Sequence, residues 1–179
     1  MLNHENDKKF LYITSGGRLY KIDAKNGTLE KSFGDKGSVG VGFVLAAPII
    51  YKNQVVLLNA RKLQILSYSI KNGDLLSKNQ IHPKNENLYA TPWSGVALDD
   101  ELGYLFFVTG NPKPSLYGVH RPGKNLNSNS IIAFDLNKKK IIWSFQETAH
   151  DLWDFDLSAP PILGDINFKD NLIKVVIIT

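Results

Sequence analysis

A short pattern that repeats three times along the chain limits the folds open to it more than any other feature. Each copy has an apolar or β-branched run, typical of a strand, that leads into a turn. In the first two copies the turn contains Asn-Gly, at 26–27 and 72–73, and this pair supplies the positive φ angles that a tight turn demands. A second strand is expected to follow each turn, so each copy predicts a β-hairpin. The three copies are residues 18–27, 65–73 and 131–139.

The spacing of the copies indicates four strands per repeat. From Asn26 to Asn72 the chain advances 46 residues, close to the length of a four-stranded propeller blade. The third copy begins 66 residues after the second, a longer interval, because a Pro- and Gly-bearing insertion at 112–127 lies before it. We therefore predict an all-β fold, a partial β-propeller with about three to four four-stranded antiparallel blades. The further strand pairs before the later hairpins are 47–51 with 54–58, and 95–98 with 103–108.

The chain is expected to form one partial propeller domain over residues 1–179. Its last strand, 175–179, is apolar and would leave backbone groups unpaired, a liability that proteins normally cover. We therefore expect further blades, or another chain, to cover the open edges of a larger ring. The predicted parts are an incomplete blade at 1–36, a blade at 37–80, a blade at 81–147 with its inserted loop at 112–127, and the start of the next blade at 148–179.

Two other architectures are weighed against the propeller. A doubly wound sheet is disfavoured because no stretch of about 10 residues between the strands shows helical periodicity. A β-sandwich stays open, since many short strands separated by turn signals suit either all-β architecture. The internal repeat is the feature that favours the propeller.

Composition excludes several classes of function. The 179 residues carry no cysteine, which removes disulfides, thiol catalysis and cysteine metal sites. The formal charge of +4 comes mostly from scattered lysines, and the tight cluster at 138–140 fits a solvated turn, so nucleic-acid binding is not expected. No apolar run approaches the roughly 20 residues of a membrane span. Residues 1–9 are polar and lack the apolar core of a secretory signal.

A series of motifs between Trp93 and Asp156 carries the chemistry. Trp93 is followed eighteen positions later by Asn111 in a Thr-Gly-Asn-Pro turn, then by Arg-Pro-Gly at 121–123 and by His-Asp-Leu-Trp-Asp-Phe-Asp at 150–156. A flat aromatic ring, a side-chain amide and paired carboxylates suit a planar, metal-assisted redox cofactor. With this ordered series, nearly the whole chain resembles the quinoprotein alcohol and glucose dehydrogenases, eight-bladed propellers that bind pyrroloquinoline quinone (PQQ).

The resemblance implies a cofactor site near the start of this series. Trp93 would form the aromatic floor beneath the quinone, for which the other interpretation is a core tryptophan. Thr91 is similar to a hydroxyl that binds the cofactor in some relatives, although a plain strand residue fits equally. Asn111 resembles the family's calcium ligand through its amide oxygen, whereas by residue type alone it also fits a left-handed turn after Gly110.

The acidic residues of the last motif have separate implied roles. Asp154 occupies what resembles the family's general-base position, and it would also bind the metal; the other interpretation is a solvated loop aspartate. A carboxylate at the spacing of Asp156 completes the metal site in lanthanide-using relatives, but it also occurs in calcium-type sugar dehydrogenases, so Ca²⁺ and a lanthanide both stay open. His150 and Asp151 are expected to form a hydrogen-bonded loop pair that orients the site without ligating the metal.

The third hairpin also matches the family's tryptophan-docking pattern, in which a tryptophan packs between neighbouring blades. Ala133, Asp135 and Trp143 stand at the expected intervals, and Lys139 stands where glycine is usual. The resemblance therefore assigns Trp143 a structural role and not a catalytic one.

One departure weakens the transfer of function. Family members carry an acidic metal ligand on a longer loop before the second hairpin, whereas residues 58–64 here contain no acid. Two hypotheses follow. The first is a portion of a PQQ-dependent dehydrogenase that oxidises an alcohol or sugar hydroxyl, with hydride passing to the quinone and Asp154 taking the proton. The second is a non-catalytic propeller that serves as a binding or assembly scaffold. The resemblance implies a periplasmic location, although this chain shows no signal peptide.

Overall fold

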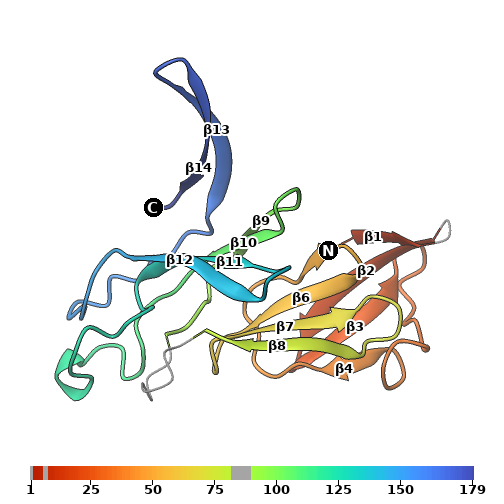
Figure 1. Ribbon diagram of the computed structural model, residues 1–179. Helices are drawn as coiled ribbons and strands as arrows, with labels where there is room; N and C mark the ends of the chain where they lie inside the picture. Colours follow the sequence, from red (N-terminus) through yellow and green to blue (C-terminus); the bar gives the residue numbers. More distant parts are fainter. Residues whose placement is uncertain (1, 6–7, 82–89) are drawn as a thin grey trace. The chain divides into compact units, whose positions relative to one another are not determined.

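The computed structural model describes residues 2–5, 8–81 and 90–179, and these form an almost entirely β structure (Figure 1). Within the described residues there are three four-stranded antiparallel sheets, one separate two-stranded hairpin and one short 3₁₀ helix. The expected all-β class is therefore confirmed. The chain divides into two compact units, Met1–Gln80 and Ile81–Thr179. No helix in the described part of the chain is long and apolar enough to span a membrane.

In the first unit, two four-stranded sheets share an apolar core. Alternating burial along the second strand sends Phe10 and Tyr12 inward, where Tyr12 meets the ring of Phe33 at 5.8 Å between centroids. Val55 and Leu57 reach the same core from the other sheet. The first sheet contains β1 Leu2–Glu5, β2 Lys8–Ser15, β3 Arg18–Asp23 and β4 Ser38–Gly40; the second contains β5 Ile49–Tyr51, β6 Gln54–Asn59, β7 Gln64–Ser69 and β8 Leu75–Gln80.

A buried lysine joins the two sheets of this unit. Lys21 on β3 is 2% exposed, and its ammonium group donates to the carbonyl oxygen of Ile70 at 2.9 Å. The same carbonyl accepts the Tyr12 hydroxyl at 2.8 Å, and the Lys21 ammonium lies 4.3 Å from the centroid of the Phe10 ring. These contacts compensate for removing the charge from water, which is otherwise costly.

The Asn-Gly turns differ from the expectation in two details. Only the glycines, Gly27 and Gly73, have positive φ angles, of 74° and 78°, and each donates its N–H to the carbonyl four residues earlier. In the first copy, the strand expected directly after the turn is reduced to an isolated bridge at Leu29. The loop that follows instead buries Phe33 in the core, so β4 begins only after it.

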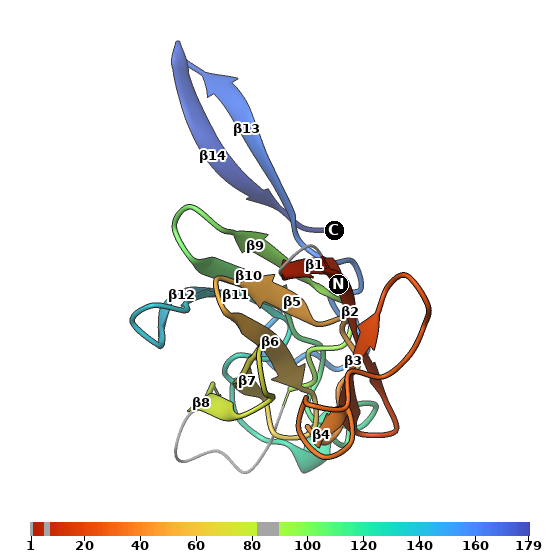
Figure 2. The same cartoon turned by 90° about the vertical axis from the view of Figure 1, so that its right-hand side faces the viewer.

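The second unit contains one four-stranded sheet and a separate hairpin, which Figures 1 and 2 both show unpaired with that sheet. Strands β10 (Tyr104–Val108) and β11 (Ser130–Asp135) are buried along most of their length. Val108 and Ile131 pack with Leu157 and with Val176 of the hairpin. The expected hairpins at 65–73 and 131–139, and the strand pairs before them, are therefore confirmed. The elements are β9 Val96–Asp99, β10 Tyr104–Val108, η1 Gly118–His120, β11 Ser130–Asp135, β12 Lys140–Gln146, β13 Ile162–Phe168 and β14 Asn171–Ile177.

The predicted blade boundaries stay predictions. The start of the 81–147 blade falls largely on residues 82–89, which lie outside the described residues, as do residues 1, 6 and 7 of the predicted incomplete blade.

A cavity of about 410 Å³ lies between the β9–β12 sheet and the β13–β14 hairpin. Trp143 on β12 lines it and is 41% exposed, with its ring 5.9 Å from that of Phe106. Leu163 and Val175 line the side formed by the hairpin. The structural role that the docking pattern implies for Trp143 stays a prediction.

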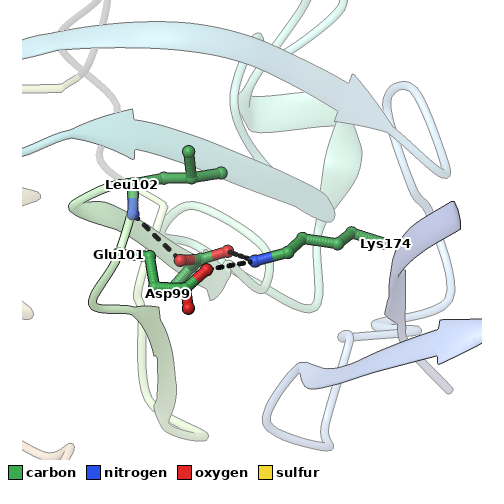
Figure 3. A network of polar contacts seen from close by, with 4 residues as sticks. All are labelled: Asp99, Glu101, Leu102 and Lys174. Carbon is green, nitrogen blue, oxygen red and sulfur yellow. Dashed lines mark hydrogen bonds and ion pairs between the residues drawn. The ribbon is translucent and has the colours of Figure 1, made fainter.

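Charged side chains bridge the rim of the same cavity. Lys174 on β14 lies 3.1 Å from Asp99 and 3.1 Å from Glu101, both in the β9–β10 hairpin (Figure 3). Asp99 also accepts the N–H of Leu102 at 3.0 Å, and this bond, followed by the contact with Lys174, lowers the pKa of Asp99. Because Lys174 and Glu101 are exposed, salt is expected to weaken these ion pairs.

Lys139 occupies the turn position at which the resemblance expects glycine, and its φ angle is 55°. The left-handed conformation costs a non-glycine residue about 1 kcal/mol because its Cβ crowds the backbone. We expect Lys139→Gly to raise the free energy of unfolding by about 0.5–1 kcal/mol, seen as a higher urea midpoint. Lys138→Gly, at a position without positive φ, is the matched control and should be neutral or destabilising; equal stabilisation by both would contradict this explanation.

Candidate functional site

Four chain segments meet at one end of the β9–β12 sheet because its strands alternate in direction. The segment with Trp93 leads into β9, and the turn with Asn111 leaves β10. Asn129 comes directly before β11, and the loop 150–156 follows β12. Antiparallel pairing of β9 with β10, β10 with β11 and β11 with β12 places these four ends at the same edge.

Asp156 joins the indole of Trp93 to the backbone of Asn111. Its Oδ2 accepts the Trp93 Nε1–H at 3.1 Å, and its Oδ1 accepts the Asn111 N–H at 2.6 Å. Gly110 permits this approach, since a Cβ there would lie 2.3 Å from the Asp156 carboxyl group. The predicted indole, amide and carboxylate are therefore brought together, and the Trp93 side chain stays 37% exposed.

Burial raises the pKa of Asp156 above its ordinary value. The N–H of Asn111 opposes this effect, but the neighbouring carboxylates of Asp154 and Asp151 add to it by repulsion. A cation bound beside these groups would favour the ionised form and return the pKa of Asp156 toward its ordinary value. The electrostatics of the cluster thus suit a positive charge.

Asp151 is the buried centre of the loop 150–156. Its Oδ1 accepts the N–H of Trp153 at 2.8 Å, and its Oδ2 accepts the N–H of Phe155 at 2.6 Å. Oδ2 also accepts the side-chain amides of Asn111 at 2.7 Å and Asn129 at 2.8 Å. Burial by itself would raise the pKa of Asp151, but these hydrogen bonds outweigh it and hold the pKa below its ordinary value.

The amide of Asn111 is oriented with its oxygen free. Its Nδ2 donates to Asp151 and lies 3.5 Å from Oδ1 of Asp154. Reversing the amide would set its oxygen against two carboxylates, so electrostatics determine the orientation. Asn111 Oδ1 is then buried without a hydrogen-bond partner. Such an atom is a suitable ligand for a hard cation, so these residues fit the implied metal.

The carboxylates alone do not make a metal site. Among the described residues, no group of three or more His, Cys, Asp or Glu side chains is arranged to hold a metal ion. A cation at this edge would therefore depend on the amide oxygen of Asn111 together with Asp154 and Asp156.

Two expectations for neighbouring residues have different outcomes. The Thr91 carbonyl accepts the N–H of Gly110 at 3.1 Å, which holds the segment before Trp93 beside the Asn111 turn, while the role of its hydroxyl stays a prediction. The expected pair of His150 and Asp151 is wrong. His150 Nδ1 instead bonds to the carbonyl of Gly123 at 2.8 Å, and the oxygens of Asp151 accept four other N–H donors.

Arg121 is a supporting residue whose role the sequence did not reveal. Its fully buried guanidinium group donates to Asn125 Oδ1 at 2.7 Å and to the carbonyl oxygen of Asp151. It thereby ties the insertion at 112–127 to the loop 150–156. The Arg-Pro-Gly motif marked the position, but nothing in the local sequence indicated that the guanidinium group would be buried.

Asn129 is the second residue that sequence reasoning missed. It is buried, and its Oδ1, like that of Asn111, has no hydrogen-bond partner. Asn125, Asn127 and Asn129 alternate along the chain with φ angles of 52°, 62° and 41°. Asparagine tolerates this left-handed conformation, so the alternation is a signal for an unusual backbone, although it does not show which amide faces the site.

Comparison of the sequence with known families identifies the family of this chain. Residues 67–179, more than half of the chain, match the PQQ glucose/ethanol/alcohol dehydrogenase β-propeller domain. The chain belongs to this family. A quinoprotein glucose dehydrogenase of Escherichia coli K12 is 27% identical over 202 residues, which cover 94% of this chain and 25% of that protein. The quinoprotein alcohol dehydrogenase PedH of Pseudomonas putida is 47% identical over 82 residues, or 45% of this chain and 13% of PedH.

Solved structures confirm the partial β-propeller over the β-sandwich. A europium-containing methanol dehydrogenase superposes with a TM-score of 0.76 at 19% identity, over 98% of this chain and 37% of that structure. At this identity the likeness shows the fold alone. This chain spans about a quarter of the length of the curated relatives that it matches over most of its own length.

Proposed function

We propose that this chain is the portion of a PQQ-dependent dehydrogenase that carries the cation site and the general base. The whole protein would oxidise an alcohol or sugar hydroxyl. The observation that carries the proposal is the cluster of Trp93, Asn111, Asp154 and Asp156, in which Asn111 Oδ1 is buried and unpartnered. Relatives named as glucose and alcohol dehydrogenases support a hydroxyl-bearing substrate.

The proposed binding roles follow from residue chemistry. Asn111 Oδ1, Asp154 and Asp156 would hold Ca²⁺ or a lanthanide ion, since all three provide hard oxygen ligands. The europium in the similar methanol dehydrogenase supports the lanthanide alternative without deciding between the two. Trp93, whose indole edge is held by Asp156, would present its face to the planar cofactor, with Thr91 beside it.

The chain's own residues would divide the work of the oxidation. PQQ, when bound, supplies the acceptor for the hydride that leaves the substrate carbon, and the metal makes that acceptor more electrophilic. Asp154 accepts the hydroxyl proton of the substrate on its carboxylate. Asp151 holds the loop 150–156 in place through the N–H groups of Trp153 and Phe155, which limits where Asp154 can lie. We also propose a periplasmic location on the family resemblance.

A non-catalytic propeller is the second candidate, and one observation favours it. The turn between β6 and β7 provides no acidic ligand of the kind that the family places there. Asn59 at its start is engaged in structural bonds instead, donating to the carbonyl of Val41 at 3.2 Å and accepting the N–H of Lys62 at 3.1 Å. With one ligand fewer, such a protein would keep the blades as a binding or assembly surface.

Cofactor titration distinguishes the two candidates. PQQ is added with Ca²⁺ or La³⁺ to the full-length protein that carries this sequence, while tryptophan fluorescence and dye-linked alcohol and sugar oxidation are followed. Saturable quenching is expected, with most of it lost in Trp93→Ala and retained in the control Trp143→Ala, because Trp143 lies on the cavity beside the β13–β14 hairpin. Absence of binding at micromolar PQQ with either metal would favour the scaffold.

A further inference from the structure

Two side-chain amides, one from the turn after β10 and one from the segment before β11, donate to a single carboxylate oxygen. Asn111 Nδ2 lies 2.7 Å and Asn129 Nδ2 lies 2.8 Å from Oδ2 of Asp151. The two asparagines are neighbours through the backbone as well, since the N–H of Asn129 donates to the carbonyl of Gly110 at 3.3 Å. All three side chains are buried, so water cannot easily replace one of these bonds.

Asn129 connects Asp151 to the part of the loop between the proposed metal ligands. Its Nδ2 donates a second hydrogen bond to the carbonyl of Phe155 at 3.0 Å, and Phe155 lies between Asp154 and Asp156 in the chain. Phe155 donates its own N–H to Oδ2 of Asp151 at 2.6 Å. Asn129 therefore holds two groups in place: the Asp151 carboxylate, which orients Asn111, and the backbone of Phe155, which lies between the acidic residues.

We propose that Asn129 is a positioning residue: acting through Asp151, it holds the Asn111 amide with its oxygen turned toward an incoming cation. The inference rests on the proposed function, because it presupposes a cation at Asn111 Oδ1. Without Asn129, the Asp151 carboxylate keeps the bond to Asn111 but loses one of the donors that fix its own orientation. Outer partners of metal ligands typically change metal affinity by about 10–100-fold when removed.

A pair of glycine substitutions in the same loop tests the proposal. Asn129 and Asn127 both have positive φ angles, 41° and 62°, so glycine fits either backbone. The Asn127 amide donates to the carbonyl of Ile81 at 3.1 Å and its oxygen accepts the Ser144 hydroxyl at 3.1 Å, both away from Asp151. Asn127→Gly is therefore the matched control.

The measurement is a titration of the full-length protein with terbium(III), followed by tryptophan-sensitised emission, with circular dichroism and urea unfolding of each metal-free variant alongside. We expect the Kd for terbium to rise about 10–100-fold in Asn129→Gly and less than about twofold in Asn127→Gly. A purely structural role would lower the urea midpoint but leave the Kd of the folded variant unchanged. That result, or an equal rise in both variants, would overturn the proposal.

A metal-free readout separates failure of this inference from failure of the proposed function. If the unaltered protein binds no terbium, the proposal of a cation site fails. Hydrogen exchange of the Asn111 side-chain amide, followed by NMR, still tests whether Asn129 positions Asn111. We expect exchange at least about tenfold faster in Asn129→Gly than in the unaltered protein or Asn127→Gly, because the bond to Asp151 opens more often. Equal exchange rates in all three would show that Asn129 does not hold Asn111.

Discussion

Asp154→Asn in the full-length protein is expected to lower kcat for dye-linked alcohol or sugar oxidation by about a thousandfold. A positioned base typically contributes about 10²–10⁴-fold, and an amide cannot accept the hydroxyl proton at neutral pH. The substitution suits the backbone, because Asp154 has a φ angle of 60° and asparagine tolerates the left-handed region as well as aspartate does. Asparagine also keeps one oxygen for the metal, so PQQ quenching should survive while turnover is lost.

Asp170→Asn is the matched control for this experiment. Asp170 has a φ angle of 61° in the turn between β13 and β14, and it is exposed. The control removes the same charge from the same kind of backbone, and its kcat should stay within about twofold of the unaltered protein. Turnover that persists in Asp154→Asn would remove the assignment of Asp154 as the base, whatever the metal affinity shows.

Asp151→Ala is expected to lower the free energy of unfolding by about 3 kcal/mol. The carboxylate accepts four hydrogen bonds in a buried position, and each buried donor left without a partner costs about 1–3 kcal/mol, reduced where water enters. Urea unfolding followed by tryptophan fluorescence measures the loss. Asp100→Ala, on the exposed β9–β10 turn, is the control and should change stability by no more than about 0.5 kcal/mol.

The pH dependence of that loss provides a second check. The pKa of Asp151 in the folded protein lies below its ordinary value of 3.8, so its stabilisation is complete above that value and disappears as the pH falls through the folded pKa. The difference in stability between the unaltered protein and Asp151→Ala should therefore shrink in acid. A difference that stays constant from neutral pH to below about pH 3 would show that the ionised carboxylate is not what stabilises the loop.

The contribution of Asp156 to stability is expected to change with pH in the opposite direction to that of Asp151. The folded pKa of Asp156 is raised, so its contribution is present at low pH and is lost as the pH rises from its ordinary value of 3.8 through the folded pKa. Stability profiles of the metal-free protein thus combine two carboxylates with opposed slopes, which is why the Asp151 effect is best measured as a difference between variants.

Much of the strand pattern was predictable because hairpins depend on neighbours in the chain. The segment 65–73 forms most of β7 and the turn before β8 as expected, with Gly73 at a φ of 78°. The first copy shows the limit of this reasoning. Its strand after the turn was displaced because the burial of Phe33 in the core reshaped the loop, and core packing depends on residues far away in the sequence.

The candidate site, too, was predictable from the sequence only in part. The spacing of Trp93, Asn111 and the acidic motif led to the family, and the structure brings these groups together. The pairing of His150 with Asp151 was wrong, and the buried roles of Arg121 and Asn129 were missed. Each of these outcomes depends on which hydrogen-bond donor of one loop reaches which acceptor of another, and residue type alone does not determine this pairing.

By itself the sequence determined most of the strands, the turn glycines and the family, because alternation, positive φ angles and motif spacing are properties of short stretches of chain. Only the tertiary structure decided that Asn111 and Asn129, 40 and 22 residues before Asp151, would share one of its carboxylate oxygens. The physical reason is that burial makes every donor compete for the few acceptors within reach, and antiparallel strand pairing sets which groups are within reach.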